Sequence, residues 1–493
     1  MTLTTSLLSL AAGAALLGLV TQIPIAPATW LALPLLLHAS RSMPPGLGTL
    51  YLWIAVYAAF LFGNRGMLPF GGAPYFGANG ALATTLVLPF LIDRLVASRT
   101  GGLTSTLVFP MAFVAAEFLR SRFAPPATWN SLAYTQYGWL PLMQVAAFVG
   151  IWGISFLLGW TASTFEWAWA RNFDWPLIRV PVMTCAAVFG CIIFAGSIRV
   201  AAAPTDRPSM RAVALNAPLD IFEPGEMTKI ASGRVSPAER PYLADKLARV
   251  QSWFLEGSRR EARAGARLVA WPEQNLLVFA EDEPAFLARA QRLAADEHVY
   301  LVMGLGTVHV GTPLPFENKS VVIDASGNVL ASYLKSRPVA GWEASVMRRG
   351  DGRLPIMDMP EGRLVTAICF DADFPELMRQ AGRGGADLLV VPANEWRKIK
   401  DVHAQMAAFR AIENGVSLLR PAASGISSAV DPWGRVLGVS DHFSGGDRTL
   451  TAQVPIGHTA TLYAKTGDLF AWLCVVGVLA AVVGRIWTDS IAR

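Results

Sequence analysis

The sequence predicts a protein in two parts, a multi-span α-helical membrane bundle and a polar α/β domain. Of the 493 residues, 53% are hydrophobic and only 16% are charged, which is more apolar than an average soluble protein. Residues 1–40 contain no Asp, Glu, Lys or Arg, whereas residues 205–455 hold most of the charge. A chain of this length also exceeds one ordinary domain, so we expect each part to fold around its own core.

Membrane spans are predicted from runs of about 20 predominantly apolar residues, the length that crosses a bilayer. Eight segments qualify, of which the second and fourth are short or interrupted by proline. They lie near residues 4–22, 24–40, 48–64, 79–97, 104–120, 140–162, 179–198 and 468–486. The first segment lacks a preceding basic region and is followed directly by more apolar segments. We therefore interpret it as a span and not as a cleaved signal peptide.

These spans define the expected domains and their orientation. We expect a membrane domain of about seven helices over 1–204, an extracytoplasmic domain over 205–460, and a last span with a short cytoplasmic tail over 461–493. More of the span-flanking arginines face the cytoplasm if the N-terminus is inside. Those predicted inside are Arg41, Arg94, Arg99, Arg171, Arg179, Arg485 and Arg493; those predicted outside are Arg65, Arg120 and Arg122. In a bacterial cell the polar domain would then face the periplasm from the inner membrane.

Two further features of composition bear on partners. The net charge of +5 has no Lys/Arg-rich block, so we predict no nucleic-acid partner. The loop over residues 123–140 is aromatic and uncharged. It fits an aromatic belt at the headgroup level, or a lip over which a lipid chain enters.

The polar domain alternates strand and helix patterns. Strands are expected over 211–216, 267–271, 299–304 and 386–392, a hairpin over 319–335 and two more strands within 417–437. Amphipathic helices are expected over 238–264, 286–297 and 402–414. Hairpins together with intervening helices favour a layered α/β or α+β sandwich.

One thiol stands alone in the polar domain. Cys369 follows a strand-like run over 363–368 and precedes a helix signalled by Asp373 and Pro375, whereas Cys185, Cys191 and Cys474 lie in apolar segments. A helix N-terminus near a thiol favours the thiolate, the form that attacks. A lone Cys in an enzyme-like domain is a candidate nucleophile.

Glu273 and Lys335 are the candidate partners of that thiol. All three residues are expected at strand ends, where open sheets present their chemistry. Glu can take the thiol proton, Lys can stabilise an oxyanion, and Cys can form a thioester. Taken singly, Glu273 also fits a cap after Pro272, and Lys335 a solvated hairpin residue. The scattered histidines and the lack of a glycine-rich phosphate loop predict neither a metal nor a cofactor.

The local contexts of these residues resemble the nitrilase (carbon–nitrogen hydrolase) superfamily. They are Trp-Pro-Glu273-Gln-Asn, Tyr-Leu-Lys335-Ser-Arg-Pro and Ala-Ile-Cys369-Phe-Asp, followed by Asn394-Glu-Trp, His403 to Gly415, and Asp431-Pro-Trp-Gly. The resemblance implies a nitrilase-like α-β-β-α sandwich over about 211–455 and a Glu-Lys-Cys triad. Together with seven preceding spans and one closing span, the chain resembles the bacterial apolipoprotein N-acyltransferase family.

The sequence departs from the family pattern in three places. After the lysine, Arg337-Pro-Val-Ala-Gly-Trp-Glu343 keeps the Glu but not the usual Pro-Phe-Gly; the nucleophile is followed by Phe370-Asp371 in place of Tyr-Glu; and Asn216-Ala-Pro replaces an early Gln-Gly-Asn. By resemblance, Glu343, Phe370 and Asp371 orient the site or bind substrate. Trp396 would form part of an acyl-facing wall.

The resemblance implies acyl transfer in two steps. Cys369 would take an acyl chain from a phospholipid as a thioester and pass it to the N-terminal amine of a diacylglyceryl-cysteine lipoprotein. We expect the protein to act as a monomer in contact with membrane lipid. The alternative is a membrane-anchored amidase with water as acceptor, and a third class is a transporter or assembly factor with a non-catalytic domain.

Overall fold

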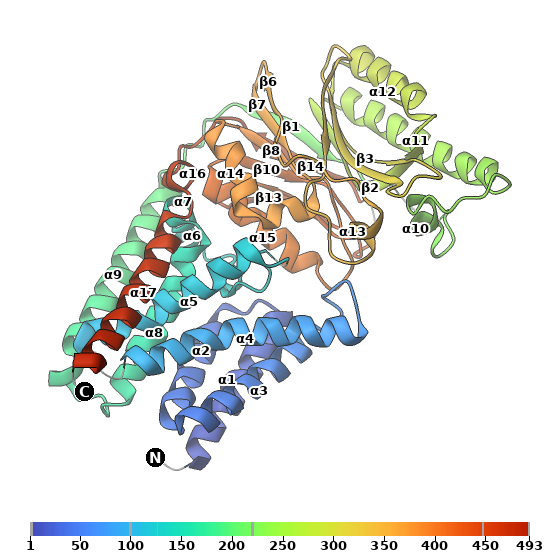
Figure 1. The fold of residues 1–493 in the computed structure, drawn as a ribbon. Helices are drawn as coiled ribbons and strands as arrows, with labels where there is room; N and C mark the ends of the chain where they lie inside the picture. Colours follow the sequence, from blue (N-terminus) through green and yellow to red (C-terminus); the bar gives the residue numbers. More distant parts are fainter. Residues whose placement is uncertain (1–2, 98–100, 126, 218–220, 446–447, 492–493) are drawn as a thin grey trace. The chain divides into compact units, whose positions relative to one another are not determined.

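The chain folds into two compact units (Figure 1). The computed structural model describes residues 3–97, 101–125, 127–217, 221–445 and 448–491. We call the first unit, which comprises Met1–Ala203 and Thr466–Arg493, the helical unit. We call the second, Pro204–Lys465, the sandwich unit.

The helical unit is built from long apolar helices joined by short turns. Its long helices are α1 (Leu3–Gln22), α2 (Ala26–Ser42), α3 (Pro45–Gly63), α4 (Gly72–Val96), α5 (Gly102–Phe123), α8 (Ile151–Trp169), α9 (Trp175–Ala201) and α17 (Leu469–Ile491). Shorter turns are η2 (Leu132–Gln136), α6 (Leu140–Met143) and α7 (Ala146–Val149). Within the described residues, six helices are long and apolar enough to cross a membrane: α1, α3, α4, α5, α9 and α17.

Two of the eight predicted spans differ in the structure. The second is α2, which has only 17 residues with Pro34 inside it and is not among the six. The expected continuous span over 140–162 is wrong, because the chain bends by 118° between Leu140–Val149 and Ile151–Trp169. Gly150, with φ of +69°, makes this bend, a backbone conformation that glycine adopts without a steric penalty. Counting the bent pair as one span gives seven.

The aromatic loop that follows α5 packs into the helical unit. Trp129 and Tyr134 are only 6% and 4% exposed, so neither belongs to an aromatic belt, and the belt interpretation is wrong for them. Glu117 of α5 accepts hydrogen bonds from Ser131 Oγ and Leu132 N, both at 3.1 Å. These bonds satisfy polar groups that could not stay unpaired in an apolar bundle.

The sandwich unit contains two six-stranded sheets. The first has the order β14-β1-β2-β3-β4-β5 and the second β13-β12-β10-β8-β7-β6. The strands of the first sheet are β14 (Leu450–Pro455), β1 (Ser209–Ala214), β2 (Leu268–Phe279), β3 (Tyr300–Val308), β4 (Phe316–Ile323) and β5 (Val329–Leu334). Those of the second are β13 (Val436–Asp441), β12 (Ile426–Val430), β10 (Ser417–Arg420), β8 (Leu388–Val390), β7 (Gly362–Thr366) and β6 (Ile356–Met359). A separate pair joins β9 (Ala393–Asn394) to β11 (Ala422–Ala423).

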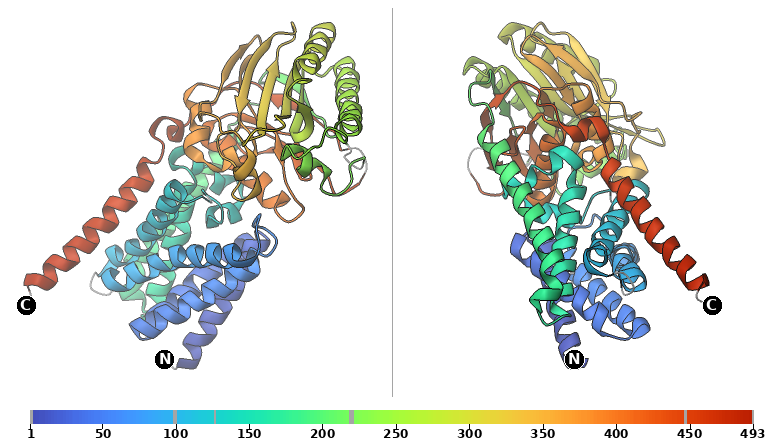
Figure 2. Two further views of the ribbon diagram at one scale, coloured as in Figure 1. Left: turned by 45° about the vertical axis from the view of Figure 1, so that its right-hand side comes forward. Right: turned by 90° about the vertical axis from the view of Figure 1, so that its left-hand side faces the viewer.

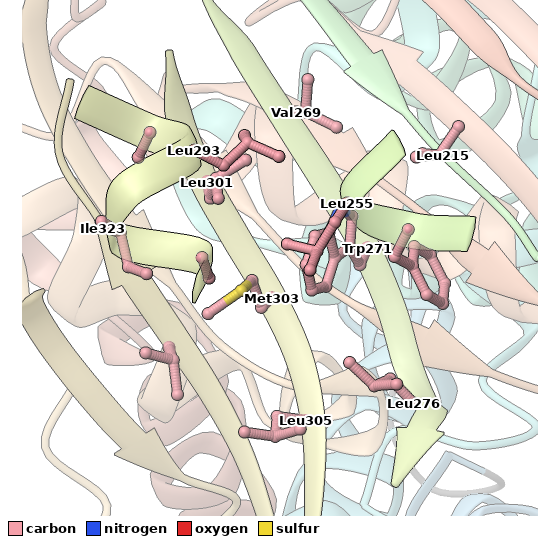
Figure 3. Packing of buried hydrophobic residues seen from close by; sticks show 14 of the residues in the cluster. Leu215, Leu255, Val269, Trp271, Leu276, Leu293, Leu301, Met303, Leu305 and Ile323 are labelled. Carbon is pink, nitrogen blue, oxygen red and sulfur yellow. The ribbon is translucent and has the colours of Figure 1, made fainter. Parts of the chain in front are cut away.

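Alternating side chains along β2 place the sheets between helices. Leu268 and Ala270 belong to a core cluster that also includes Leu388 and Leu419 of the second sheet, so the two sheets pack face to face. Val269 and Trp271 point the other way, into a cluster beneath α11 (Arg240–Arg263) and α12 (Glu283–Glu297) (Figure 3). This period of two is what a strand buried on both faces requires.

Helices cover the outer face of each sheet. α11 and α12 lie on the first sheet, while α14 (Pro375–Arg383) and α15 (Lys400–Asn414) lie on the second (Figure 2). The order of layers is therefore α-β-β-α, and the expected fold class is confirmed.

β2 does not end at Pro272, as the sequence pattern predicted. It continues to Phe279, with a break in register: Trp271 pairs with Met303 and Leu276 with Leu305, so that Gly304 alone opposes four residues. A Cβ on Gly304 would lie 2.3 Å from the Pro272 carbonyl oxygen and 2.7 Å from the Glu273 nitrogen. Because Gly304 has no side chain, the bulge in β2 can pack against β3. The bulge directs the Glu273 side chain away from the regular hydrogen-bonded ladder between the two strands.

Gly304→Ala is expected to destabilise the sandwich unit by about 1–3 kcal/mol, because the new methyl group meets rigid backbone. Thermal unfolding of the purified protein would measure this. Gly438→Ala is the matched control, since its Cβ would meet only the end of the Leu450 side chain, at 2.9 Å. Equal melting temperatures for the two variants would contradict the role of Gly304.

Candidate functional site

Lys335 occupies a buried position between two carboxylates. It follows β5 directly, as expected, but is only 1% exposed, so the solvated-hairpin interpretation is wrong. Its Nζ donates to Glu273 Oε1 at 2.8 Å and lies 2.9 Å from both oxygens of Glu343. Burial opposes the ammonium charge, yet Glu273 and Glu343 hold the pKa of Lys335 well above its usual value. The site therefore contains a permanent cation.

Glu273 is fixed by three donors. Besides Lys335, Asn318 Nδ2 donates to its Oε1 at 2.6 Å, and the Asn394 backbone N–H donates to its Oε2 at 2.9 Å. Asn318 also donates to Glu343 Oε1 at 3.0 Å, which links the two carboxylates. Sequence reasoning missed Asn318 as a site residue, because it lies in the interior of β4 without a local motif. Its position opposite Lys335 in the hairpin was the available signal.

Glu343 lies on the short helix α13 (Trp342–Val346) and is 7% exposed. Its Oε2 accepts from the Val339 N–H at 2.6 Å, and Gln274 Nε2 lies 3.3 Å from its Oε1. The segment that replaces the family's usual Pro-Phe-Gly therefore still places the Glu343 carboxylate beside Lys335.

Cys369 begins η3 (Cys369–Asp373), two residues after β7, and is 4% exposed. Its φ of +46° is a left-handed conformation that is uncommon for a residue with a side chain. Its N–H donates to the Pro392 carbonyl at 2.8 Å, and its Sγ lies 3.7 Å from the Asn394 carbonyl oxygen. The Asn394 peptide therefore contacts both the thiol and Glu273.

The thiol is protonated at rest, contrary to the thiolate expected from a helix N-terminus. Burial and then the charge of Glu273 raise the pKa of Cys369 well above its usual value, and Lys335 offsets only part of this. η3 is a single turn, and α14 begins only at Pro375. A base must therefore take the proton before the sulfur can attack.

The three remaining predicted residues differ in their surroundings. Asp371 is fully buried, and burial raises its pKa to about 6. It accepts hydrogen bonds from Tyr333 OH, Ser336 N, Ser336 Oγ, Arg337 N and Ile368 N at 2.9–3.2 Å. It therefore ties the segment after Lys335 to η3. The half-buried Phe370 ring packs edge-on against Phe374, with centroids 5.3 Å apart. Trp396 is half-buried in the segment between β9 and α15.

A second buried charge network lies beside Cys369, and sequence reasoning did not assign it. His403 of α15 places Nε2 2.9 Å from Asp373 Oδ1 and Nδ1 2.7 Å from Glu395 Oε1. Arg420, at the end of β10, pairs with the same Glu395 oxygen. All four residues are at most 7% exposed. Their charges sum to zero only if His403 is protonated. Among the described residues, no group of three or more His, Cys, Asp or Glu side chains is arranged to hold a metal ion.

The sequence of the sandwich unit is that of a carbon–nitrogen hydrolase domain. A sequence model described as "Carbon-nitrogen hydrolase" matches residues 229–463, and one described as "Apolipoprotein N-acyltransferase N-terminal domain" matches residues 12–164. The chain belongs to the apolipoprotein N-acyltransferase family.

Similar proteins extend over nearly the whole chain. An apolipoprotein N-acyltransferase of Geobacter metallireducens is 28% identical over 497 residues, covering 94% of this chain and 91% of the relative. One of Bradyrhizobium diazoefficiens is 26% identical over 444 residues, covering 83% and 79%. Among solved structures, an amidase from Nesterenkonia sp. aligns with 53% of this chain and 94% of its own, at 23% identity and a TM-score of 0.41.

Asp371→Ala is expected to lower the free energy of unfolding more than Tyr333→Phe. The first change removes the acceptor of five hydrogen bonds, including that of the buried Ile368 N–H, whose loss alone costs about 1–3 kcal/mol. The second removes only the contacts of one hydroxyl group, with Asp371 and Ser336, each worth about 1 kcal/mol. Thermal unfolding of both variants would compare them. If the two variants lost the same stability, Asp371 would not be the tie between the two segments.

Proposed function

We propose that this protein transfers a fatty acyl chain from a phospholipid, through a thioester on Cys369, to the N-terminal amine of a lipoprotein. The observation that carries the proposal is that the Cys369 thiol and the Glu273 carboxylate meet at the backbone of Asn394, through its carbonyl oxygen and its N–H. The names of the relatives favour an acyltransferase over an amidase that uses water as acceptor.

In the first step, Glu273 takes the proton from Cys369 as Sγ attacks the ester carbonyl of the phospholipid. A C–S bond forms and the carbonyl oxygen becomes an oxyanion. The Lys335 ammonium stabilises this charge, as does the N–H of Phe370, which has no protein acceptor among the described residues. Collapse breaks the C–O bond, and Glu273 returns its proton to the departing lysophospholipid oxygen.

In the second step, the lipoprotein amine attacks the thioester and Glu273 accepts one of its protons. A C–N bond forms, the C–S bond breaks, and the proton passes to the leaving sulfur. The amide product leaves Cys369 as a thiol and Glu273 as a carboxylate, so the site returns to its starting state. In this cycle Glu343 and Asn318 hold Lys335 and Glu273 in place, and Trp396 forms part of the wall along which the acyl chain lies.

The proposed location is the bacterial inner membrane, with the sandwich unit on the periplasmic side. This orientation requires seven spans before the sandwich unit, so we propose that the shorter helix α2 crosses the membrane together with the candidate spans and the bent pair. The distribution of arginines around these helices then supports a cytoplasmic N-terminus. Membrane-embedded helices would supply the phospholipid from the bilayer, and the lipoprotein acceptor would reach the site from the same surface. We propose that one copy of the chain is sufficient for the reaction.

Cys369→Ser is expected to abolish turnover, because an alcohol is far less ionised than a thiol near neutral pH. Intact-mass measurement after incubation with phospholipid should find an added acyl group on the parent protein and none on the variant. Cys474→Ala is the control: that cysteine lies in α17 of the helical unit, and its variant should still be acylated. An acyl adduct on the Cys369→Ser protein would remove this residue from the mechanism.

Orientation can be measured by labelling intact cells with a membrane-impermeant thiol reagent. A cysteine at Ser326, in the exposed turn between β4 and β5, should be labelled, whereas one appended after the last residue should react only in broken cells. The opposite pattern would invert the proposed topology.

A further inference from the structure

The charge network of Asp373, His403, Glu395 and Arg420 connects the two segments that hold the reacting thiol. Asp373 is the last residue of η3, the turn that begins with Cys369. Glu395 directly follows Asn394, whose N–H donates to Glu273 and whose carbonyl faces Sγ. His403 bridges the carboxylates of Asp373 and Glu395. A shift of this ring would change the position of the thiol relative to its base.

The contacts of the His403 ring favour its doubly protonated form. A neutral imidazole has one N–H and one lone pair, so it can donate to only one of two acceptors. Here both ring nitrogens face carboxylate oxygens, at 2.9 and 2.7 Å. A neutral ring protonated at Nε2 could accept at Nδ1 from Arg420 Nη2, 3.1 Å away, but its lone pair would then also face the closer Glu395 oxygen. The proton on His403 Nδ1 also stabilises the charge of Glu395. The buried Oε2 of Glu395 has no hydrogen-bond partner among the described residues, so only Arg420 and His403, both at Oε1, neutralise this carboxylate.

The charged groups that face the ring come from three elements. Asp373 lies on η3, Glu395 follows β9, and Arg420 ends β10. Burial and the Arg420 guanidinium oppose a charge on the ring, while Asp373 and the hydrogen bonds to Asp373 and Glu395 favour it. Together these groups raise the pKa of His403 to about 9. The ring therefore stays charged at neutral pH.

We propose that His403 is a positioning residue of the acyl-transfer site, and that its imidazolium holds the Cys369 turn and the Asn394 peptide at the spacing that lets Glu273 take the thiol proton. This inference rests on the proposed function, in which Cys369 is acylated. His403 touches neither substrate nor the reacting atoms, and it acts through Asp373 and Glu395.

The proposal gives a pH dependence with a definite sign. The folded pKa of His403 lies above its usual value of 6.5, so the bridge is fully present at pH 7 and is lost as the pH rises through about 9. Acylation of Cys369 should fall over the same range and recover when the pH is returned to 7. This direction is opposite to that of an unassisted thiol, which becomes more reactive as the pH rises.

The experiment follows single-turnover acylation of the full-length protein by dioleoyl-phosphatidylglycerol in detergent micelles, using intact-mass measurement. His403→Gln keeps a polar side chain but can donate to only one of the two carboxylates. Its rate constant should fall about 10²-fold, the size of effect that a shift of about 1 Å in a reacting group produces, while half-saturation by lipid stays nearly constant. His458→Gln is the matched control, because His458 Nδ1 faces only the Ala386 carbonyl oxygen, at 3.1 Å.

A second reagent separates this inference from the proposed function. Alkylation of Cys369 by iodoacetamide, read by peptide mapping at pH 7, also needs Glu273 to take the thiol proton but involves no lipid. A parent protein that is alkylated but never acylated would overturn the acyltransferase proposal alone. Equal rates for the parent and His403→Gln with both reagents would overturn the role of His403, as would an equal loss in His458→Gln.

If His403→Gln does not fold, the dependence of Cys369 acylation on pH in the parent protein tests the proposal instead. A reversible fall in acylation as the pH rises through about 9, with the fold intact by circular dichroism, supports the proposal. A rate that is constant or rises from pH 7 to pH 10 overturns it, because the bridge would then be dispensable.

Discussion

The buried ammonium of Lys335 is the interaction on which the rest of the site depends. An ammonium ion loses several kcal/mol of hydration when it enters a protein interior, and only close carboxylates and good geometry offset that loss. Glu273 and Glu343 provide them, and each carboxylate then needs further donors of its own. Asn318, Val339 and Asn394 are those donors. These contacts fix the strands β2, β4 and β9 and the short helix α13 around one charge.

Two local departures from regular backbone place Glu273 and Cys369 around that charge. The β2 bulge opposite Gly304 turns Glu273 out of the hydrogen-bonded ladder, and the left-handed conformation of Cys369 starts a turn after the two residues that follow β7. Regular β-structure would have directed both side chains into the layered core. Such features persist only where surrounding packing determines them, and here both lie among fully buried strands.

Local periodicity was sufficient for a layered sandwich, the hairpin before Lys335 and the turn at Cys369, whereas the α-β-β-α order of the layers came from the resemblance to a known family. Sequence patterns failed at Pro272, which usually ends a strand but here lies within a bulge that β3 accommodates through Gly304. They also failed at Gly150, where one glycine breaks an apolar run that is otherwise long enough for a single span. Asn318 and His403 were missed because their roles come from partners 25 to 45 and 8 to 30 residues away.

The high pKa of Cys369 has a consequence for the survival of the protein before it meets substrate. Oxidants and disulfides react with thiolates, so a buried thiol that keeps its proton is a poor target for sulfenic acid formation or mixed-disulfide exchange. The three other cysteines all lie in the helical unit, and none of the four is in a disulfide. The same desolvation that keeps the proton on Cys369 therefore also preserves this thiol in its reduced form.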